Sequence, residues 1–319
     1  MVETHAHRRW SSVEPIPDGS RKVVYAALAG NLFTAGSKFI AAAVSGSSAM
    51  LTEAVHSTAD CTNQLLLLIG VRRARRRADA THPFGYGLEI YFWTFVVAVL
   101  VLLAGGAYSV ARGLEELADP SPIAWPGLSL FVLLLSAALD GASFRIGYRE
   151  YRNVEARHRR PGRPIGLIQF IRWSKDPSLY ESLLEDGAAL AGLGVAAAGI
   201  VATAYIGIPE ADGAASLAIG MILLGNGTAI LVSTRSLIAG EGVAPPVLEE
   251  LWSVIHAHDH RGRVTDLATL HLGPKRILIA LTLSEPRSAS EPHFLRKLEL
   301  SLKAAEPRLH DVLFRYSRS

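Results

Sequence analysis

Residues 51–70, LTEAVHSTADCTNQLLLLIG, form an apolar stretch that carries ionisable side chains. His56 and Asp60 are four residues apart and so share one face of a helix, with Glu53 three residues before His56. An ionisable group at membrane depth costs roughly 2.5–3.5 kcal/mol on insertion scales, so such groups face a bundle interior or a wet cavity. An imidazole and a carboxylate at this spacing can hold an ion such as Zn²⁺. The alternative is a His–Asp hydrogen bond that only ties helices together.

This stretch is one of six that are long and apolar enough to cross a membrane, which takes ~20 residues each. The 319-residue chain is 50% hydrophobic and only 19% charged, which is typical of a membrane protein with a soluble part. We therefore predict an α-helical membrane protein with a six-helix transmembrane bundle. The predicted spans are residues 22–44, 48–71, 90–112, 126–148, 179–205 and 213–237.

The charges of the loops predict the orientation of the bundle. The segments after the second and fourth spans are rich in arginine, whereas SGSS, EELADPSPIAWP and GIPEADG on the other side hold no Lys or Arg. The positive-inside rule then places both termini in the cytoplasm, with a bacterial inner membrane as the expected location. Nucleic-acid binding is the rival interpretation of the arginine runs, but basic juxtamembrane loops are expected here. The first 20 residues lack an apolar core, so no cleavable signal peptide is predicted.

A soluble domain is expected after residue 238. Residues 246–260 and 290–306 have helical patterns, and VTDLATLHL, RILIALTLS and LHDVLFRYS have strand patterns. The order αββαβ suggests a small ferredoxin-like domain, which would gain from dimerisation. The predicted domains are a cytoplasmic tail over 1–21, the transmembrane domain over 22–238 and the cytoplasmic domain over 239–319.

The second half of a metal site is expected on the fifth span, where YESLLEDGAALAGLGV begins at Tyr180. Asp186 and Ser182 share one face of this helix, whereas Glu181 and Glu185 share the next, rotated by about 100°. A tetrahedral site needs four donors, and His56, Asp60, Asp186 and one neighbour would supply them. Glu181 can equally be part of a solvated helix start. On the fourth span, Asp140 is expected to form a local pair near the helix end.

With these residues in place, the chain resembles the cation diffusion facilitator family of proton-coupled zinc and manganese efflux transporters. The resemblance rests on HSTAD after SGSSAMLTEA, on HPFGYGLE in the following loop, on the acidic fifth helix and on the αββαβ domain. HSTADCTNQ and SKDPSLYESLLEDGAA further resemble the branch that includes the animal mitochondrial zinc transporter and many bacterial relatives.

The resemblance implies metal ligands at His56, Asp60 and Asp186. Ser182 stands where the family has histidine or aspartate, and serine is a poor zinc ligand, so Glu185 is the candidate for the missing donor. A second, loop-borne site would map to Asp79 and His82, but Tyr86 replaces its histidine. His82 can instead order the loop.

The expected function is proton-coupled efflux of a divalent cation, most simply Zn²⁺, from the cytoplasm by alternating access. No permanently bound cofactor is expected, because the ion and the protons are the cargo. The partners expected are the lipid bilayer and a second copy of the chain in a homodimer. No nucleic-acid partner is expected. Efflux of Mn²⁺, Fe²⁺ or Co²⁺ remains an alternative, as does a non-transporting regulatory or scaffold member of the same fold. A membrane metalloenzyme is the other class, but HExxH is absent, so no enzyme activity is expected.

Overall fold

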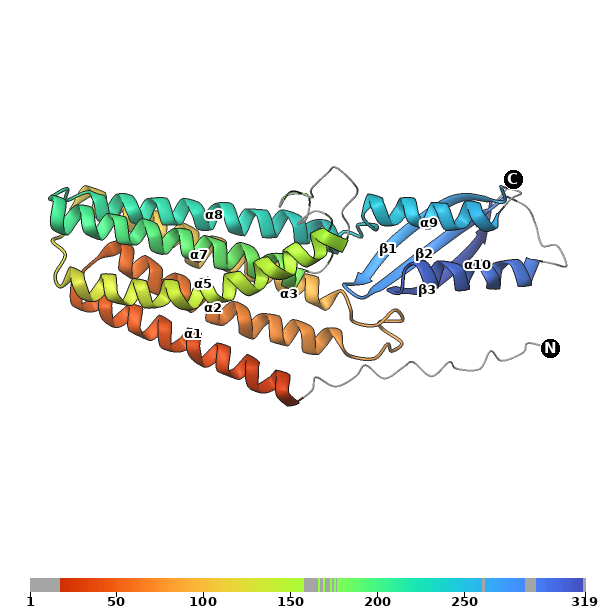
Figure 1. Cartoon of the computed structure of the whole chain (residues 1–319), viewed down its shortest axis with the longest axis horizontal. Coiled ribbons are helices and arrows are strands. Elements are labelled where there is room, and N and C mark those ends of the chain that lie inside the picture. Colours follow the sequence, from red (N-terminus) through yellow and green to blue (C-terminus); the bar gives the residue numbers. More distant parts are fainter. Residues whose placement is uncertain are drawn as a thin grey trace.

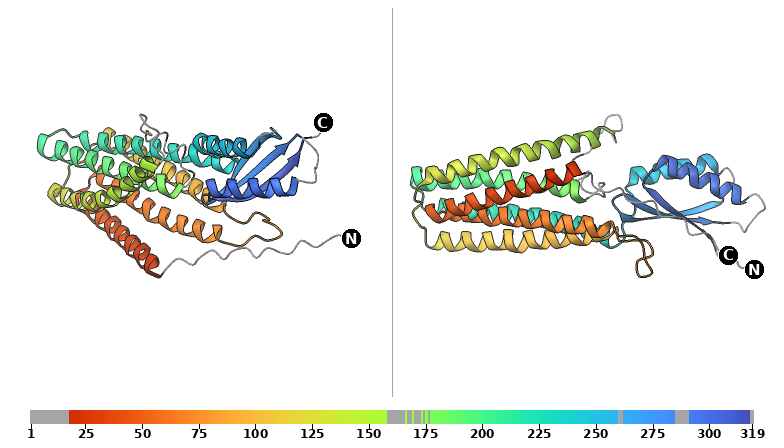
Figure 2. Two further views of the ribbon diagram at one scale, coloured as in Figure 1. Left: turned by 45° about the vertical axis from the view of Figure 1, so that its right-hand side comes forward. Right: turned by 90° about the horizontal axis from the view of Figure 1, so that it is seen from below.

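The fold was obtained as a computed structural model that describes residues 18–157, 177–259, 262–284 and 291–317, with the single positions 166, 169, 173 and 175. Most of the N-terminal tail and most of the basic segment before the fifth span lie outside these residues. Long helices run side by side, and a small α/β domain extends beyond one end of them (Figures 1 and 2). The chain therefore has a helical part and a sheet-containing part, in the predicted order.

The helical part follows the predicted spans, but two helices are longer than hydropathy alone predicts. The helices are α1 (Asp18–Ser45), α2 (Ser48–Ala74), α3 (Glu89–Leu100) with η1 (Val101–Ala107) and α4 (Tyr108–Ala118), α5 (Pro126–Arg157), α7 (Pro177–Val201) with η2 (Ala202–Ile206), and α8 (Ala211–Ile238). The third predicted span continues to residue 118 and the fourth to residue 157. Hydropathy marks only the lipid-compatible part of a helix, whereas the backbone hydrogen bonds continue into the charged segment beyond it.

Four helical segments of the described residues are long and apolar enough to cross a membrane: Glu89–Ala118, Pro126–Arg149, Tyr180–Ile206 and Ala211–Ile238. The helix α2 is not among them because Glu53, His56, Asp60 and its terminal arginines lower its hydropathy. The prediction of six spans therefore stays a prediction for α1 and α2.

The first residues of α2 are fixed by α8. Ser47 is the N-cap of α2, and its Oγ accepts a hydrogen bond of 3.1 Å from the Met50 amide. The Asp212 carboxylate on α8 accepts hydrogen bonds from Ser47 Oγ (2.7 Å) and from the amides of Ser48 (2.5 Å) and Ala49 (3.2 Å). These are the amides that a helix leaves unpaired at its start. The helix that carries His56 is therefore anchored to α8 at its N-terminal end.

Close packing joins α4 to α8. A Cβ added at Gly113 would lie 2.6 Å from the Leu217 amide nitrogen, and one at Gly220 would lie 2.7 Å from the Val110 amide nitrogen. Only glycine permits this approach of two helix backbones. The two helices thus form one side of the bundle, whereas α1, α2, α5 and α7 surround the cavity described below.

The C-terminal domain contains α9 (Pro245–His258), β1 (Val264–Gly273), β2 (Arg276–Leu283), α10 (Glu291–Ala305) and β3 (Leu309–Tyr316). This is the element order predicted from the sequence. The strands lie in the order β1-β2-β3, with β1 and β2 antiparallel and β2 and β3 parallel. Both helices cover one face of the sheet (Figure 2). The core between them contains Leu251, Ile255, Ile277, Ile279, Leu281, Leu298 and Leu302.

Candidate metal centre

A polar stripe on α2 carries the residues that the sequence singled out. Glu53, His56, Ser57 and Asp60 follow one another at helical spacing on one side of the helix. The His56 side chain is 2% exposed, and its Nδ1 lies 3.5 Å from Oδ1 of Asp60. Neither ring nitrogen of His56 has a hydrogen-bond partner in the described part of the chain. Buried polar atoms are normally paired, so these two nitrogens are available for a ligand.

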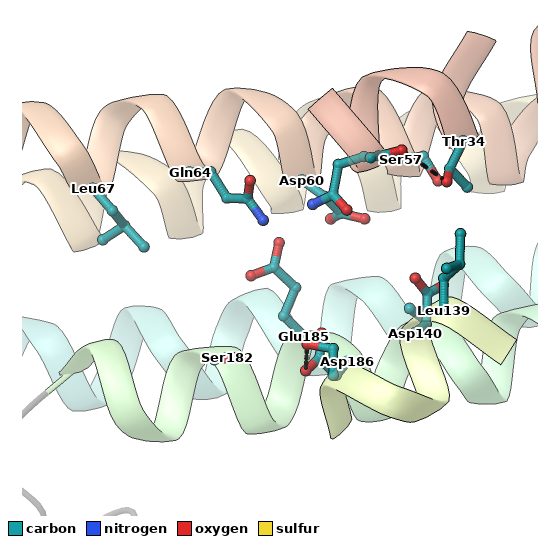
Figure 3. Close-up of a pocket in the computed structure, with 14 residues that line it drawn as sticks. Thr34, Ser57, Asp60, Gln64, Leu67, Leu139, Asp140, Ser182, Glu185 and Asp186 are labelled. Carbon is teal, nitrogen blue, oxygen red and sulfur yellow. Dashed lines mark hydrogen bonds between the residues drawn. The ribbon is translucent and has the colours of Figure 1, made fainter. Parts of the chain in front are cut away.

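Glu185 on α7 is the residue that reaches across to this stripe. Its Oε1 accepts a hydrogen bond of 3.0 Å from Nδ2 of Asn63 on α2. Its carboxyl group also faces Asp60 across the cavity, and Figure 3 shows the side chain directed from α7 toward α2. Two facing carboxylates repel each other unless a proton or a cation lies between them. Asp60 and Glu185 are therefore placed to share one.

Asp186 and its neighbours on α7 take other positions. Oδ2 of Asp186 accepts a hydrogen bond of 2.8 Å from Ser143 on α5, so this carboxylate is directed to α5 rather than to His56. Ser182 lies on the cavity wall one turn away. Glu181 is buried, and neither of its oxygens has a hydrogen-bond partner among the described residues. The solvated helix start considered for Glu181 is therefore wrong.

A cavity of about 460 Å³ lies beside these residues, between α1, α2, α5 and α7 (Figure 3). It is lined by Gly30, Asn31, Thr34, Ser57, Asp60, Gln64, Leu67, Leu139, Asp140, Ser143, Ser182, Glu185, Asp186 and Ala189. Four of these side chains are carboxylic acids, and none is a lysine or arginine. Asp140, which was expected to pair near its helix end, is thus a cavity residue that the sequence alone did not identify. The cavity favours a cation.

Asp60, Glu185 and Asp186 line one cavity, and His56 is buried beside Asp60, but these donors do not converge on one point. In the described part of the chain, no three His, Cys, Asp or Glu side chains lie close enough together to hold a metal ion. His56, Asp60 and Glu185 form the nearest approach to a ligand set, whereas Asp186 is turned toward Ser143. The ligand set thus stays a prediction.

In the loop after α2, the Asp79 carboxylate is bound by groups of the loop itself. Its carboxylate accepts hydrogen bonds from Tyr86 Oη (2.6 Å), Thr81 Oγ1 (2.7 Å) and the His82 amide (2.8 Å). These bonds hold the pKa of the Asp79 carboxyl well below its usual range. The exposed His82 ring stacks on Tyr86 at 4.0 Å between centroids. The geometry favours an ordered turn over the second metal site that was mapped to Asp79 and His82.

Histidines of the C-terminal domain have structural contacts. His258 contacts the Val254 carbonyl oxygen at 2.9 Å and Ser301 Oγ at 3.0 Å through its two ring nitrogens. His256 stacks on Trp252, and His260 lies outside the described residues. His271 is buried on β1, and this burial lowers its pKa to about 4.

The bundle and its acidic cavity are consistent with the comparisons to known proteins. The family described as "Cation efflux transmembrane domain" matches residues 24–239 of this chain. The chain therefore belongs to the cation efflux, or cation diffusion facilitator, family of multi-pass membrane transporters, as the sequence motifs predicted.

Among its relatives, "Proton-coupled zinc antiporter SLC30A9, mitochondrial" of Xenopus laevis is 27% identical over 301 residues, which cover 94% of this chain and 53% of that protein. "Metal tolerance protein C4" of Arabidopsis thaliana is 33% identical over 204 residues, 64% of this chain and 44% of that protein. "Magnetosome protein MamM" of Magnetospirillum gryphiswaldense is 26% identical over 235 residues, 72% and 67% of the two chains. The chain thus spans about half the length of the first two relatives.

Proposed function

We propose that this protein exports Zn²⁺ from the cytoplasm by alternating access, in exchange for protons. The observation that carries the proposal is the pair of unpartnered His56 nitrogens, buried beside Asp60 and across from Glu185. An imidazole nitrogen and carboxylate oxygens are ligands that Zn²⁺ takes in tetrahedral sites, whereas Mn²⁺ prefers oxygen alone. The Xenopus relative named as a proton-coupled zinc antiporter supports this choice of ion.

Each residue has a defined part in the proposed cycle. The carboxylates of the cavity attract the hydrated ion from the cytoplasmic side, and His56, Asp60 and Glu185 bind it. Asp186 is the fourth candidate, and its side chain would rotate away from Ser143 to reach the ion. Because ligands bind metal only when deprotonated, protons that arrive from the opposite side displace the ion. The protonated ligands then return the empty site to the cytoplasmic side. The exchange thus needs only a pH gradient.

The proposal also covers the topology, the oligomeric state and the location of the protein. We place six spans over residues 22–238 and both termini in the cytoplasm, because the arginine-rich segments follow the second and fourth predicted spans and the other loops hold no Lys or Arg. Residues 239–319 form a ferredoxin-like cytoplasmic domain in this proposal, and two copies pair as a homodimer. The proposed location is a bacterial inner membrane.

Reconstitution in liposomes tests the proposal. Zn²⁺ uptake driven by an imposed pH gradient is expected for the wild type and should fall to the background of empty liposomes in His56→Ala/Asp60→Asn. His293→Ala/Asp266→Asn is the matched control, because both side chains are exposed in the C-terminal domain. Flux that persists in the site variant would overturn the proposal. Absence of flux in the wild type with Zn²⁺, Mn²⁺, Fe²⁺ and Co²⁺ would favour the scaffold alternative.

A further inference from the structure

An ion pair inside the bundle stands directly beside the candidate metal centre. Nζ of Lys38 on α1 lies 3.1 Å from Oε2 of Glu53 on α2, and the two side chains are 1% and 0% exposed. Nζ also donates a hydrogen bond of 2.8 Å to Ser57 Oγ. Removing both charges from water is costly, and apolar side chains of similar size often stabilise a protein as well or better. In a membrane, such charges mark function by default.

The pair occupies the same stripe of α2 as the proposed ligands. Lys38 binds Glu53 and Ser57, which lie one on each side of His56 in the sequence and on the same side of the helix. The ammonium thus already satisfies Glu53 and Ser57 and leaves His56 and Asp60 of the same stripe for another ligand. Among the described residues, Lys38 is the buried lysine of the helical bundle, whereas Lys175 lies before α7.

Glu53 keeps one oxygen unused. Its Oε1 is buried without a hydrogen-bond partner among the described residues. It faces Gly192 on α7, where an added Cβ would lie 2.5 Å from this oxygen, so the glycine makes room for the Glu53 carboxylate. Glu53 is therefore a carboxylate donor one helical turn from His56 that is held by an ammonium rather than by a metal.

We infer that Lys38 is a resident cation that sets the affinity of the site for its divalent ion. This inference rests on the proposed function. The Lys38 ammonium holds Glu53 away from the ion and limits the ligands to His56, Asp60 and the α7 carboxylates. Its positive charge also opposes the incoming ion. A site of this kind binds less tightly than its donors alone would allow, and release to the opposite side is correspondingly faster.

Neutralising Lys38 and neutralising Glu53 should shift the affinity for Zn²⁺ in opposite directions. Lys38→Met removes the opposing charge and frees Glu53, so the dissociation constant for Zn²⁺ should fall at least about tenfold and turnover should slow. Glu53→Gln leaves the ammonium uncompensated beside the ion, so the dissociation constant should rise at least about tenfold. Lys38→Met/Glu53→Gln should fall between the two single variants. A purely structural ion pair predicts no such opposition.

The experiment is a Zn²⁺ titration against a competing chelator dye, with full-length protein in lipid nanodiscs, together with liposome flux. Arg112 and Glu116 on α4 are the matched control, since they form a 3.0 Å ion pair with a 2% exposed glutamate away from the cavity. Arg112→Met and Glu116→Gln should not shift Zn²⁺ affinity in opposite directions. Affinity shifts of the same sign in Lys38→Met and Glu53→Gln would overturn the inference, as would the absence of a shift in both. Zn²⁺ flux in the wild type would still leave the proposed function intact.

An exchanged variant covers the case in which a single variant does not fold. Lys38→Glu/Glu53→Lys keeps a buried pair but moves the ammonium onto α2, three residues from His56. Its Zn²⁺ affinity should be at least about tenfold weaker than that of the wild type. Unchanged affinity in this variant would also overturn the inference. Wild-type protein that neither binds nor transports Zn²⁺ would instead contradict the proposed function.

Discussion

The Asn63 amide on α2 donates a hydrogen bond of 3.0 Å to Oε1 of Glu185 on α7, and this contact directs Glu185 toward Asp60. Asp186, the next residue, points to Ser143 on α5 because successive residues of a helix are rotated by about 100°. The rotation of α7 therefore turns Glu185, and not Asp186, toward Asp60, and the hydrogen bond from Asn63 holds it there. This orientation makes Glu185 the first candidate for the ligand that Ser182 does not supply.

Glu185→Gln should weaken Zn²⁺ binding at least about a hundredfold, because it removes a proposed ligand. Asp186→Asn should weaken it only about tenfold, because Ser143 holds this carboxylate and Asp186 is the less favoured of the two candidate ligands on α7. A chelator-competition titration of both variants measures the difference. Ser182→Ala is the control and should stay close to the wild type, since serine is a poor zinc ligand. A larger loss in Asp186→Asn would show that this side chain leaves Ser143 when the ion binds.

Asp140 on α5 lines the cavity and is outside the proposed ligand set. Its carboxylate adds to the negative charge that concentrates cations in the cavity. Asp140→Asn should therefore raise the KM for Zn²⁺ severalfold and leave the maximal rate nearly unchanged. Initial rates of flux at different Zn²⁺ concentrations separate the two quantities. Asp140→Glu should restore the KM; a fall in maximal rate alone would contradict a role in ion capture.

The sequence was sufficient for the polar stripe of α2 and for the element order of the C-terminal domain. Both depend on local periodicity: His56 and Asp60 repeat at helical spacing, and the strands are apolar runs bounded by turns.

The orientation of the side chains around the cavity was not predictable in the same way. The sequence left Glu185 and Asp186 as candidates on neighbouring faces, and the rotation of α7 against α2 and α5 decides which partner each one meets. That rotation follows from packing between helices far apart in the sequence. For the same reason hydropathy did not place Asp140 on the cavity or pair Asp212 with the start of α2.

Asp212→Ala should destabilise the protein, because the carboxylate is the acceptor for two backbone amides and one hydroxyl at the start of α2. Buried donors left without an acceptor cost about 1–3 kcal/mol each. Thermal unfolding in detergent should therefore begin several degrees lower than for the wild type. Ser216→Ala is the control: it removes only the 2.9 Å hydroxyl contact with Ser48 and should have a smaller effect. Equal effects would mean that Asp212 does not anchor α2.

The C-terminal sheet should lose stability as the pH falls below the usual histidine range. Burial lowers the pKa of His271 to about 4, from its usual value of 6.5. The nearby charges of Arg308 and Lys175 also lower it, whereas Glu241 raises it. Above pH 6.5 the ring is neutral in the folded and unfolded chain. Between pH 6.5 and 4 only the unfolded chain takes the proton, so the free energy of unfolding falls by up to about 1.4 kcal/mol per pH unit.

Hydrogen exchange of β1 and β2 in the full-length protein, measured from pH 7 to pH 4.5 and corrected for the intrinsic exchange rate, tests this dependence. Protection should decrease steadily in the wild type and change much less in His271→Gln, which keeps a polar side chain but takes up no proton. His293→Gln is the matched control, because this histidine is exposed on α10 and should leave the wild-type dependence in place. Parallel curves for wild type and His271→Gln would mean that another group carries the acid sensitivity of the sheet.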